Sequence, residues 1–265
     1  MKADKFIKLL KLRGEGLEDT FYINLAKIPF IFSSLFNRKP TLGEFLLKDV
    51  VARNSYGIFF CRRGEDDLGL VSDFFESEII KMLKLKEGDI AIDCGAHVGK
   101  YTVLFSKLVG ENGKVISVEA DPENFKILKR NISLNRCENV IALNCAVWDV
   151  DKTLKLNLSK IAGHHSLKKD WGKGFVKVSG RRLDDISKEF SIKKIKWLKI
   201  DVEGSEVETL LGAKKLLENN KVLNIVFEVS NSENYNRCLN IFSKFGYEIQ
   251  KTPIWNYFIA MSSKN

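Results

Sequence analysis

The chain has 265 residues, of which 45% are hydrophobic and 29% are charged, a balance that suits a folded domain and excludes a low-complexity chain. Its five cysteines are scattered without a C-x-x-C pair, which argues against a zinc site or a disulfide framework. The formal net charge is +9, and residues 151–200 alone hold 14 Lys or Arg against 5 Asp or Glu, so this segment favours an anionic partner.

The first 40 residues are basic and aromatic, and they predict one or two helices that end near Pro40. The first helix is weakly amphipathic, and we expect it to pack against the rest of the protein, with weak contact to a membrane surface as the less favoured alternative. Residues 1–13 alternate lysine with apolar side chains, unlike a signal peptide, and the apolar run at residues 28–32 is too short to span a bilayer. The sequence therefore predicts a cytoplasmic protein without a transmembrane segment.

Two apolar runs at residues 50–53 and 57–61 flank a turn and predict a β-hairpin. Residues 74–83 then predict a helix, with Ser72 or Asp73 as its N-cap. We assign residues 1–75 to an N-terminal helical and hairpin extension and residues 76–265 to the main domain.

From residue 88 onward, strand patterns alternate with helix patterns. Strands are predicted at residues 89–94, 114–119, 140–147, 195–201 and 222–229, and helices at residues 98–109, 122–135, 205–217 and 233–245. Such alternation predicts βαβ units in a mainly parallel sheet with helices on both faces. A closing antiparallel hairpin at residues 247–249 and 257–261 brings the expected sheet to seven strands.

Residues 150–194 interrupt this alternation. They contain two predicted short strands and, between them, a glycine-containing segment with His164 and His165. Because a long insertion in this type of fold is commonly functional, we interpret residues 150–194 as a substrate lid whose lysines steer an anionic acceptor. His164 is a candidate general base, since histidine titrates near neutrality; an exposed, solvated loop is the alternative.

The strongest local signal is a glycine turn that follows the strand at residues 89–94 and opens a helix. Gly95 and Gly99 would let the backbone approach a bound ligand. The next strand ends at Glu119, about 20 residues beyond the turn, where a carboxylate can accept hydrogen bonds from both ribose hydroxyls of an adenosine. Since the turn lacks the G-x-G-x-x-G spacing of dinucleotide sites, the combination favours S-adenosylmethionine over NAD.

Positions along these elements predict the cofactor contacts. Asp93 would lie near the methionine ammonium of S-adenosylmethionine, Glu119 would hold the ribose, and Ala146 with Val147 would line the adenine. The full set of expected cofactor-binding residues is Asp93, Gly95, Ala96, His97, Gly99, Thr102, Glu119, Ala120, Ala146 and Val147.

A later motif, LKIDVEGSE, occupies residues 198–206. Together with the glycine turn it resembles the FkbM family of methyltransferases, whose motif reads Ile-Lys-Ile-Asp-Val-Glu-Gly-Ala-Glu, and residues 182–185 match the family's Leu-Asp element. His97 departs from the family's usual Asn and Ser205 from its usual Ala. The resemblance covers roughly residues 50 to 260 and implies a Rossmann-like class I methyltransferase fold and O-methylation of a sugar, glycoconjugate or small-metabolite hydroxyl.

Three carboxylates, Asp201, Glu203 and Glu228, are predicted at the carboxyl ends of neighbouring strands, where open α/β sheets bind ligands. They could orient a hydroxyl, act as a general base or share a divalent metal, which we do not expect. The basic segment at residues 151–200 predicts that the small-molecule or glycan acceptor is anionic. The alternatives are an RNA ribose 2′-O-methyltransferase, suggested by the basic segment, and a non-catalytic cofactor-binding partner protein. The absence of an N/D-Pro-Pro-Tyr motif argues against methylation of exocyclic amines.

Overall fold

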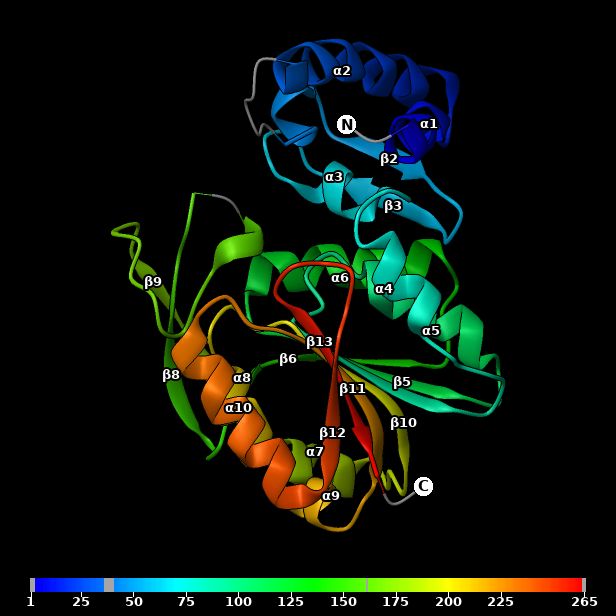
Figure 1. The fold of residues 1–265 in the computed structure, drawn as a ribbon. Helices are drawn as coiled ribbons and strands as arrows, with labels where there is room; N and C mark the ends of the chain where they lie inside the picture. Colours follow the sequence, from blue (N-terminus) through cyan, green and yellow to red (C-terminus); the bar gives the residue numbers. More distant parts are fainter. Residues whose placement is uncertain (1–2, 36–40, 161, 264–265) are drawn as a thin grey trace.

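The computed structural model describes residues 3–35, 41–160 and 162–263, in which a large sheet carries helices on both faces and a smaller N-terminal part packs against it (Figure 1). The large sheet has seven strands in the order β12-β13-β11-β10-β4-β5-β6. Strand β13 runs antiparallel to both of its neighbours, and the other adjacent pairs are parallel. The strands are β4 (Ile90–Cys94), β5 (Lys114–Glu119), β6 (Val140–Asn144), β10 (Ile195–Ile200), β11 (Val222–Glu228), β12 (Tyr247–Lys251) and β13 (Tyr257–Ser262). The predicted mainly parallel, seven-stranded, Rossmann-like sheet is confirmed.

Helices α4, α5 and α6 cover one face of this sheet, and α7 to α10 cover the other (Figure 1). Their bounds are α4 (Ser77–Met82), α5 (Lys100–Val109), α6 (Pro122–Leu134), α7 (Leu183–Glu189), α8 (Glu206–Gly212), α9 (Lys214–Glu218) and α10 (Ser232–Phe245). Because both faces are covered, neighbouring residues of one strand enter different apolar clusters: Ile92 packs on one side and Ala91 on the other.

Side-chain caps determine where two of these helices begin. The Asp121 carboxylate accepts hydrogen bonds from two backbone amides in the first turn of α6, at 2.9 and 2.8 Å, and Pro122 occupies that turn as predicted. Asn231 caps α10 by accepting a hydrogen bond from the backbone amide of Asn234 at 2.8 Å. The first cap places the start of α6 immediately after the end of β5, at the edge where the site forms.

The N-terminal extension is a three-stranded antiparallel sheet packed with helices. Its elements are α1 (Ala3–Lys11), β1 (Arg13–Gly14), α2 (Leu17–Leu35), the 3-10 turn η1 (Gly43–Phe45), β2 (Val50–Arg53), β3 (Ile58–Cys61) and α3 (Asp67–Val71). The predicted helices and hairpin are therefore present. Among the described residues, no helix is both long and apolar enough to cross a membrane.

The helix predicted at residues 74–83 is shorter in the structure. It begins only at Ser77, and residues 72–76 form a turn whose last residue, Glu76, has a φ of +51°. The buried ammonium of Lys100 donates hydrogen bonds to two carbonyl oxygens of this turn, at 3.0 and 2.6 Å. This contact with the main domain overrides the local helix preference, and local sequence does not reveal it.

Two asparagines, one in α6 and one directly after it, join the extension to the main domain. Asn131 Oδ1 accepts a hydrogen bond from the amide of Phe60 at 2.7 Å, and Asn135 Oδ1 accepts one from the amide of Ile58 at 2.9 Å. The two side-chain amides also donate to carbonyl oxygens of the same strand. They thereby satisfy the open edge of β3, whose polar groups would otherwise lack partners.

The chain after β6 forms a third, small sheet in the order β7-β9-β8. Its elements are β7 (Ala146–Val147), β8 (Lys152–Asn157), the 3-10 turn η2 (Ala162–His164) and β9 (Phe175–Arg181). The two short strands predicted here are present, and the strand predicted at residues 140–147 is divided between β6 and β7. Regular elements thus account for much of residues 150–194, and the insertion residues that line the cavity lie between 156 and 167.

Candidate functional site

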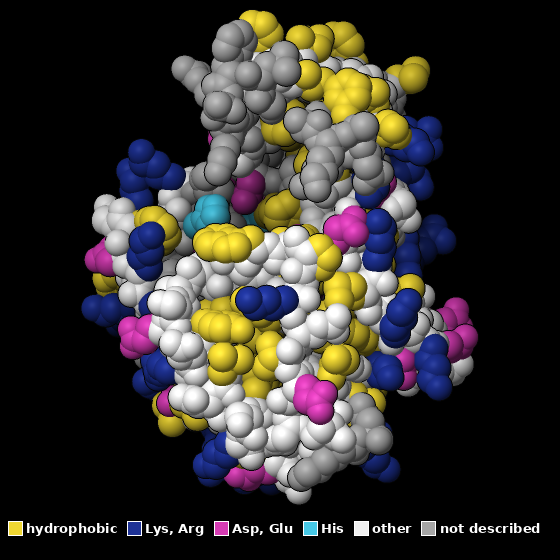
Figure 2. All heavy atoms as spheres, in the orientation of Figure 1, with side chains coloured by type: hydrophobic (Ala, Val, Ile, Leu, Met, Phe, Trp, Pro, Cys, Tyr) yellow, Lys and Arg dark blue, Asp and Glu magenta, His cyan; other side chains and the backbone are white. Residues whose placement is uncertain are grey.

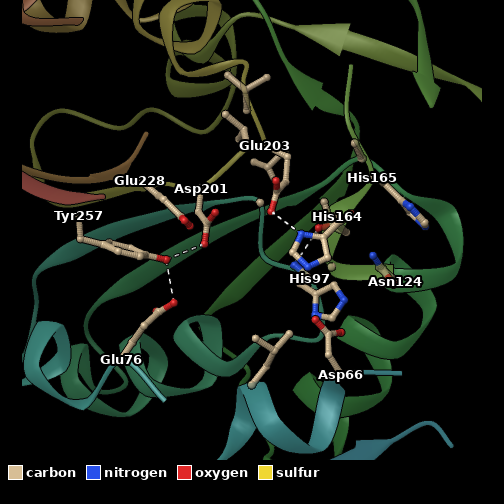
Figure 3. Close-up of a pocket in the computed structure, with 18 of the residues that line it drawn as sticks. Asp66, Glu76, His97, Asn124, His164, His165, Asp201, Glu203, Glu228 and Tyr257 are labelled. Atoms are coloured by element: carbon tan, nitrogen blue, oxygen red, sulfur yellow. Dashed lines mark hydrogen bonds and ion pairs between the residues drawn. The ribbon is translucent and has the colours of Figure 1, made fainter. Parts of the chain in front are cut away.

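A cavity of about 660 Å³ lies at the carboxyl ends of β4, β5, β10 and β11, between the extension, the insertion and the loop that joins β12 to β13. Figure 3 shows carboxylates and histidines pointing into it from several elements. Its polar lining residues are Asp66, Glu76, His97, Glu119, Asn124, His164, His165, Asp201, Glu203, Glu228 and Tyr257. Open α/β sheets bind ligands at this edge.

The glycine turn holds the two halves of this edge together. Gly95 has a φ of +78°, and a Cβ there would lie 1.7 Å from the carbonyl oxygen of Asp201. A Cβ on Gly99, with a φ of +92°, would lie 2.7 Å from a methyl carbon of Leu128. Both glycines are therefore required by the protein's own packing and backbone conformation. The sequence had suggested ligand approach as the reason.

Glu119 ends β5 and bridges the two loops beside it. Its carboxylate accepts hydrogen bonds from the backbone amides of His97 at 2.7 Å and Asp121 at 2.9 Å. Burial raises the pKa of Glu119 to about 7, although the two amide hydrogen bonds act in the opposite direction. The carboxyl group thus fixes the glycine turn relative to the start of α6 while its residue lines the cavity.

Apolar side chains form the adjoining part of the cavity wall. Ala146 and Val147, both predicted, line it together with Leu156 and Leu167 of the insertion. All but Val147 belong to, or pack against, one small apolar cluster. The sequence did not single out the two leucines, because only the folded hairpin of the insertion brings them to the end of β6.

Four of the ten expected cofactor-binding residues lie behind the cavity wall: Asp93, Ala96, Gly99 and Thr102 do not line it, whereas Gly95, His97, Glu119, Ala120, Ala146 and Val147 do. The fully buried Asp93 accepts a hydrogen bond from the Thr102 hydroxyl at 2.7 Å, and its other oxygen lies 4.0 Å from the ammonium of Lys199. Burial raises the pKa of Asp93, against the influence of that ammonium. In this structure Asp93 supports the wall.

The opposite end of the cavity contains a coupled set of charges. The buried ammonium of Lys199 contacts Asp201 Oδ2 at 2.8 Å. Burial would raise the pKa of Asp201, but the lysine outweighs it and the net pKa is lowered. Burial and the charge of Asp201 raise the pKa of Glu228 to about 9. At neutral pH the arrangement is therefore an ionised Asp201 paired with Lys199, beside a protonated Glu228.

Two further residues complete this acidic end. The Tyr257 hydroxyl donates a hydrogen bond to Glu76 Oε1 at 2.7 Å and lies 3.2 Å from Asp201 Oδ2 (Figure 3). The Tyr101 hydroxyl donates to the other oxygen of Glu76 at 2.7 Å. The sequence did not predict a role for Glu76 or Tyr257, which are 181 positions apart and come together only through the fold.

The histidines of the insertion lie at the rim. His164 Nδ1 is 3.6 Å from Glu203 Oε1, and hydrogen bonding to this carboxylate raises the pKa of His164. His165 Nδ1 accepts a hydrogen bond from the backbone amide of Ser159 at 2.9 Å. The hydroxyl of Ser166 donates to the carbonyl oxygen of Glu203 at 2.6 Å, so the insertion is attached to the loop that follows β10.

The ammonium of Lys199 already pairs with Asp201, so a divalent metal shared by Asp201, Glu203 and Glu228 would compete with this cation. Among the described residues, a different group has ligand atoms within 4.8 Å of one another: Asp66, Asp67 and His97. The guanidinium of Arg62 contacts both oxygens of Asp67 at 2.8 Å, so a cation already lies against this group as well.

The sequence profile of the methyltransferase FkbM domain matches residues 93–249, more than half of the chain. The chain belongs to the FkbM methyltransferase family. Methyltransferase sdnD from Sordaria araneosa is 25% identical over 175 residues, which cover 54% of this chain and 67% of that protein. Protein-L-isoaspartate O-methyltransferase 1 from Archaeoglobus fulgidus is 36% identical over 63 residues, 24% of this chain and 29% of the relative.

A crystal structure of methyltransferase FkbM from Methylobacillus flagellatus KT shares the fold, with a TM-score of 0.50 and 19% identity. The likeness covers 68% of this FkbM-family chain and 45% of the solved chain, so less than half of that larger protein is represented here. The family match also begins after Glu76 and ends before Tyr257. Part of the acidic end therefore lies outside the region that defines the family.

Proposed function

We propose that this protein transfers the methyl group of S-adenosylmethionine to a hydroxyl group of a sugar, glycoconjugate or small metabolite. The observation that carries the proposal is that one continuous cavity joins the Glu119 end to the acidic end around Asp201. Its volume of about 660 Å³ falls within the range of pockets that hold ligands of drug size.

The residues at the Glu119 end fit an adenosine. A buried carboxyl with a raised pKa can exchange hydrogen bonds with ribose hydroxyls, and the apolar wall of Ala146, Val147, Leu156 and Leu167 suits a purine ring. S-adenosylmethionine, when bound, supplies an electrophilic methyl group on a sulfonium. The protein's own part there is to orient that group toward the opposite end of the cavity and to limit access of water.

The residues at the acidic end fit a hydroxyl acceptor. Asp201, ionised at neutral pH, accepts a hydrogen bond from the acceptor hydroxyl and takes its proton as the oxygen gains the methyl group. Protonated Glu228 can donate a hydrogen bond to a neighbouring acceptor oxygen, and the Tyr257 hydroxyl lies between Glu76 and Asp201. His164, half-exposed beside Glu203 at the rim, is the second candidate base.

A neighbouring hollow favours a glycan among the acceptor classes. It has a volume of about 350 Å³ and shares His164 and Glu203 with the main cavity. The ring of Trp171 lines it together with amide, hydroxyl and carboxylate groups, from Asn231, Asn234, Ser230 and Glu233. An aromatic ring can pack against the apolar face of a sugar, while such polar groups hydrogen-bond its hydroxyls.

The expected steering role of the insertion's lysines has mixed support. Lys168 pairs with Glu208 at 2.7 Å, and the ammonium of Lys169 lies 3.7 Å from the centroid of the Trp171 ring. Lys160 and Lys173 are exposed. An anionic acceptor therefore stays part of the proposal, and it rests on fewer lysines than the composition suggested.

The test is transfer of labelled methyl groups by the full chain to separate pools of nucleotide sugars, oligosaccharides, small polyols and RNA. We expect label in a carbohydrate pool, in a product that survives mild base as a methyl ether does. Base-labile label released as methanol would indicate a carboxyl ester and overturn hydroxyl methylation. Label confined to RNA would establish the nucleic-acid alternative, and cofactor binding without transfer to any pool would favour the non-catalytic one.

A further inference from the structure

Large apolar side chains are exposed on the N-terminal helices more than anywhere else in the described chain. Of the sixteen that are exposed, nine lie between residues 6 and 47. On α2, Leu17 is 93% exposed, Ile28 67%, and Phe21 and Phe32 62% each. Figure 2 shows apolar side chains gathered at the top of the molecule, over α1 and α2.

The exposed side chains of α2 follow one face of the helix. Leu17, Phe21, Leu25, Ile28 and Phe32 are spaced by four, four, three and four residues, the spacing of a single helical stripe. At 1.5 Å per residue the stripe is about 22 Å long. Since Ile23 and Ala26 on the opposite face are fully buried, the core explains one apolar face of α2 and leaves the other unexplained.

Helix α1 is fixed beside this stripe and extends it. The ammonium of Lys27 donates hydrogen bonds to the carbonyl oxygens of Leu10 at 3.2 Å and Leu12 at 2.5 Å, which closes the carboxyl end of α1. Burial lowers the pKa of Lys27. Phe6, Ile7 and Leu10 of α1 are exposed as well, so two packed helices present apolar side chains to solvent.

The sequence that contains these helices is basic. Residues 1–40 contain eight Lys or Arg and four Asp or Glu. Three of these acids are already paired: Glu15 with Arg53 at 2.6 Å, and Glu18 and Asp19 with Lys48 at 2.6 and 3.7 Å. The exposed Lys11 and Arg13 have no ion pair with another described residue.

We propose that the exposed face of α1 and α2 is a docking surface for an anionic phospholipid bilayer. Phe, Leu and Ile side chains on one face with lysine and arginine beside them are the pattern of helices that lie in the interface of a membrane. A specific protein interface commonly adds about ten direct hydrogen bonds, whereas the α2 stripe offers side chains without polar atoms. The exposed cations Lys11 and Arg13 complement anionic headgroups.

Docking through α1 and α2 would determine how far the cavity lies from the membrane. The same extension that carries the docking surface contributes Asp66, Leu70, Phe74 and Phe75 to the cavity lining. A bilayer bound by α1 and α2 would therefore keep the cavity close to the membrane surface. This inference does not depend on the identity of the methyl acceptor.

The test is sedimentation of the full chain with lipid vesicles, either pure phosphatidylcholine or with about 30% phosphatidylserine. We expect binding to the anionic vesicles and weaker binding to the neutral ones. The double variant Phe21→Ser, Phe32→Ser should bind at least about tenfold more weakly, because it removes two side chains from the stripe. The matched control Leu108→Ser, Leu134→Ser, at exposed positions of α5 and α6, should bind like the parent.

A second variant separates charge from apolar contact. Lys11→Gln with Arg13→Gln should weaken binding to anionic vesicles and leave binding to neutral vesicles unchanged. Thermal unfolding of each variant verifies that it is folded. Absence of binding to either vesicle overturns the proposal. So does a dimer that forms without lipid and dissociates in the Phe21→Ser, Phe32→Ser variant, which would assign this face to a second copy of the chain.

Discussion

The two ends of the cavity are built in different ways. At the Glu119 end, the carboxylate is held by backbone amides of adjoining loops, all within the family-matched segment of residues 93–249. At the Asp201 end, side chains hold one another, and Glu76 and Tyr257 come from outside that segment. The first end depends on the fold itself, and the second depends on particular side chains.

This difference assigns each end a role that variants can test. Backbone amides are present whatever the side chains are, so a site made from them can persist while sequences diverge. A network of carboxyl, hydroxyl and ammonium groups changes when one member changes. We therefore expect the Glu119 end to determine cofactor binding and the Asp201 end to determine the acceptor and the chemistry.

The largest effect is expected from Asp201→Asn. Loss of the anion should lower kcat about 100-fold or more, the usual scale for a general base, while the Kd for S-adenosylmethionine changes little. The thermal midpoint should also fall, since Lys199 loses its nearest carboxylate. Single-turnover transfer and calorimetric cofactor binding measure the two effects. If cofactor affinity fell as much as kcat, the proposed division of roles between the two ends of the cavity would be wrong.

Glu119→Ala should affect cofactor binding, the role assigned to the Glu119 end of the cavity. We expect cofactor affinity to weaken by about 1–3 kcal/mol, or about 5- to 150-fold, the scale of hydrogen bonds to a charged group. Transfer at saturating cofactor should be largely retained. Glu123→Ala, an exposed carboxylate on the first turn of α6, is the matched control. Unchanged cofactor affinity in Glu119→Ala would remove this residue from the site.

Much of the Glu119 end could be predicted from the sequence, because it is formed by residues close together in the chain. The strand, the glycine turn and the acid at the end of the next strand leave a pattern that spacing alone reveals. Even there, the pattern did not show that Asp93 turns away from the cavity toward Thr102.

The Asp201 end could be predicted only in part. The motif around Asp201 and Glu203 is visible in the sequence, and so is Glu228 at the end of a strand. Glu76 and Tyr257 are not, because one lies in a turn held by Lys100 and the other on a strand at the far end of the chain. Contacts over such sequence distances exist only after the sheet has formed.

Tyr257→Phe should have a smaller effect, and it tests whether the network tunes the acceptor site. The variant removes the hydroxyl between Glu76 and Asp201 and keeps the buried ring. We expect kcat to fall about tenfold or less, the scale of one ordinary intramolecular hydrogen bond, with unchanged cofactor affinity. Tyr235→Phe, on α10, is the control. If Tyr257→Phe weakened cofactor affinity and left kcat unchanged, Tyr257 would belong to the cofactor-binding end of the cavity.

Glu228→Gln should have the smallest effect on kcat at neutral pH. Its effect on the thermal midpoint should depend on pH, and this dependence tests the protonation state of Glu228. The folded pKa of about 9 lies above the ordinary value of a glutamate, so folding favours the protonated carboxyl. Stability from this group is fully present below pH 4 and is lost progressively as the pH rises toward 9, because only the unfolded chain ionises freely across that window. Glutamine has the shape of the protonated acid and cannot ionise.

We therefore expect the thermal midpoint of Glu228→Gln to exceed that of the parent by an amount that grows between pH 5 and pH 9, about a few degrees at the upper end. Differential scanning calorimetry at several pH values measures this difference, and Glu248→Gln on β12 serves as the exposed control. A difference that stays constant with pH would mean that Glu228 is ionised in the folded protein, and the acidic end would then hold two neighbouring anions in place of one anion and one proton donor.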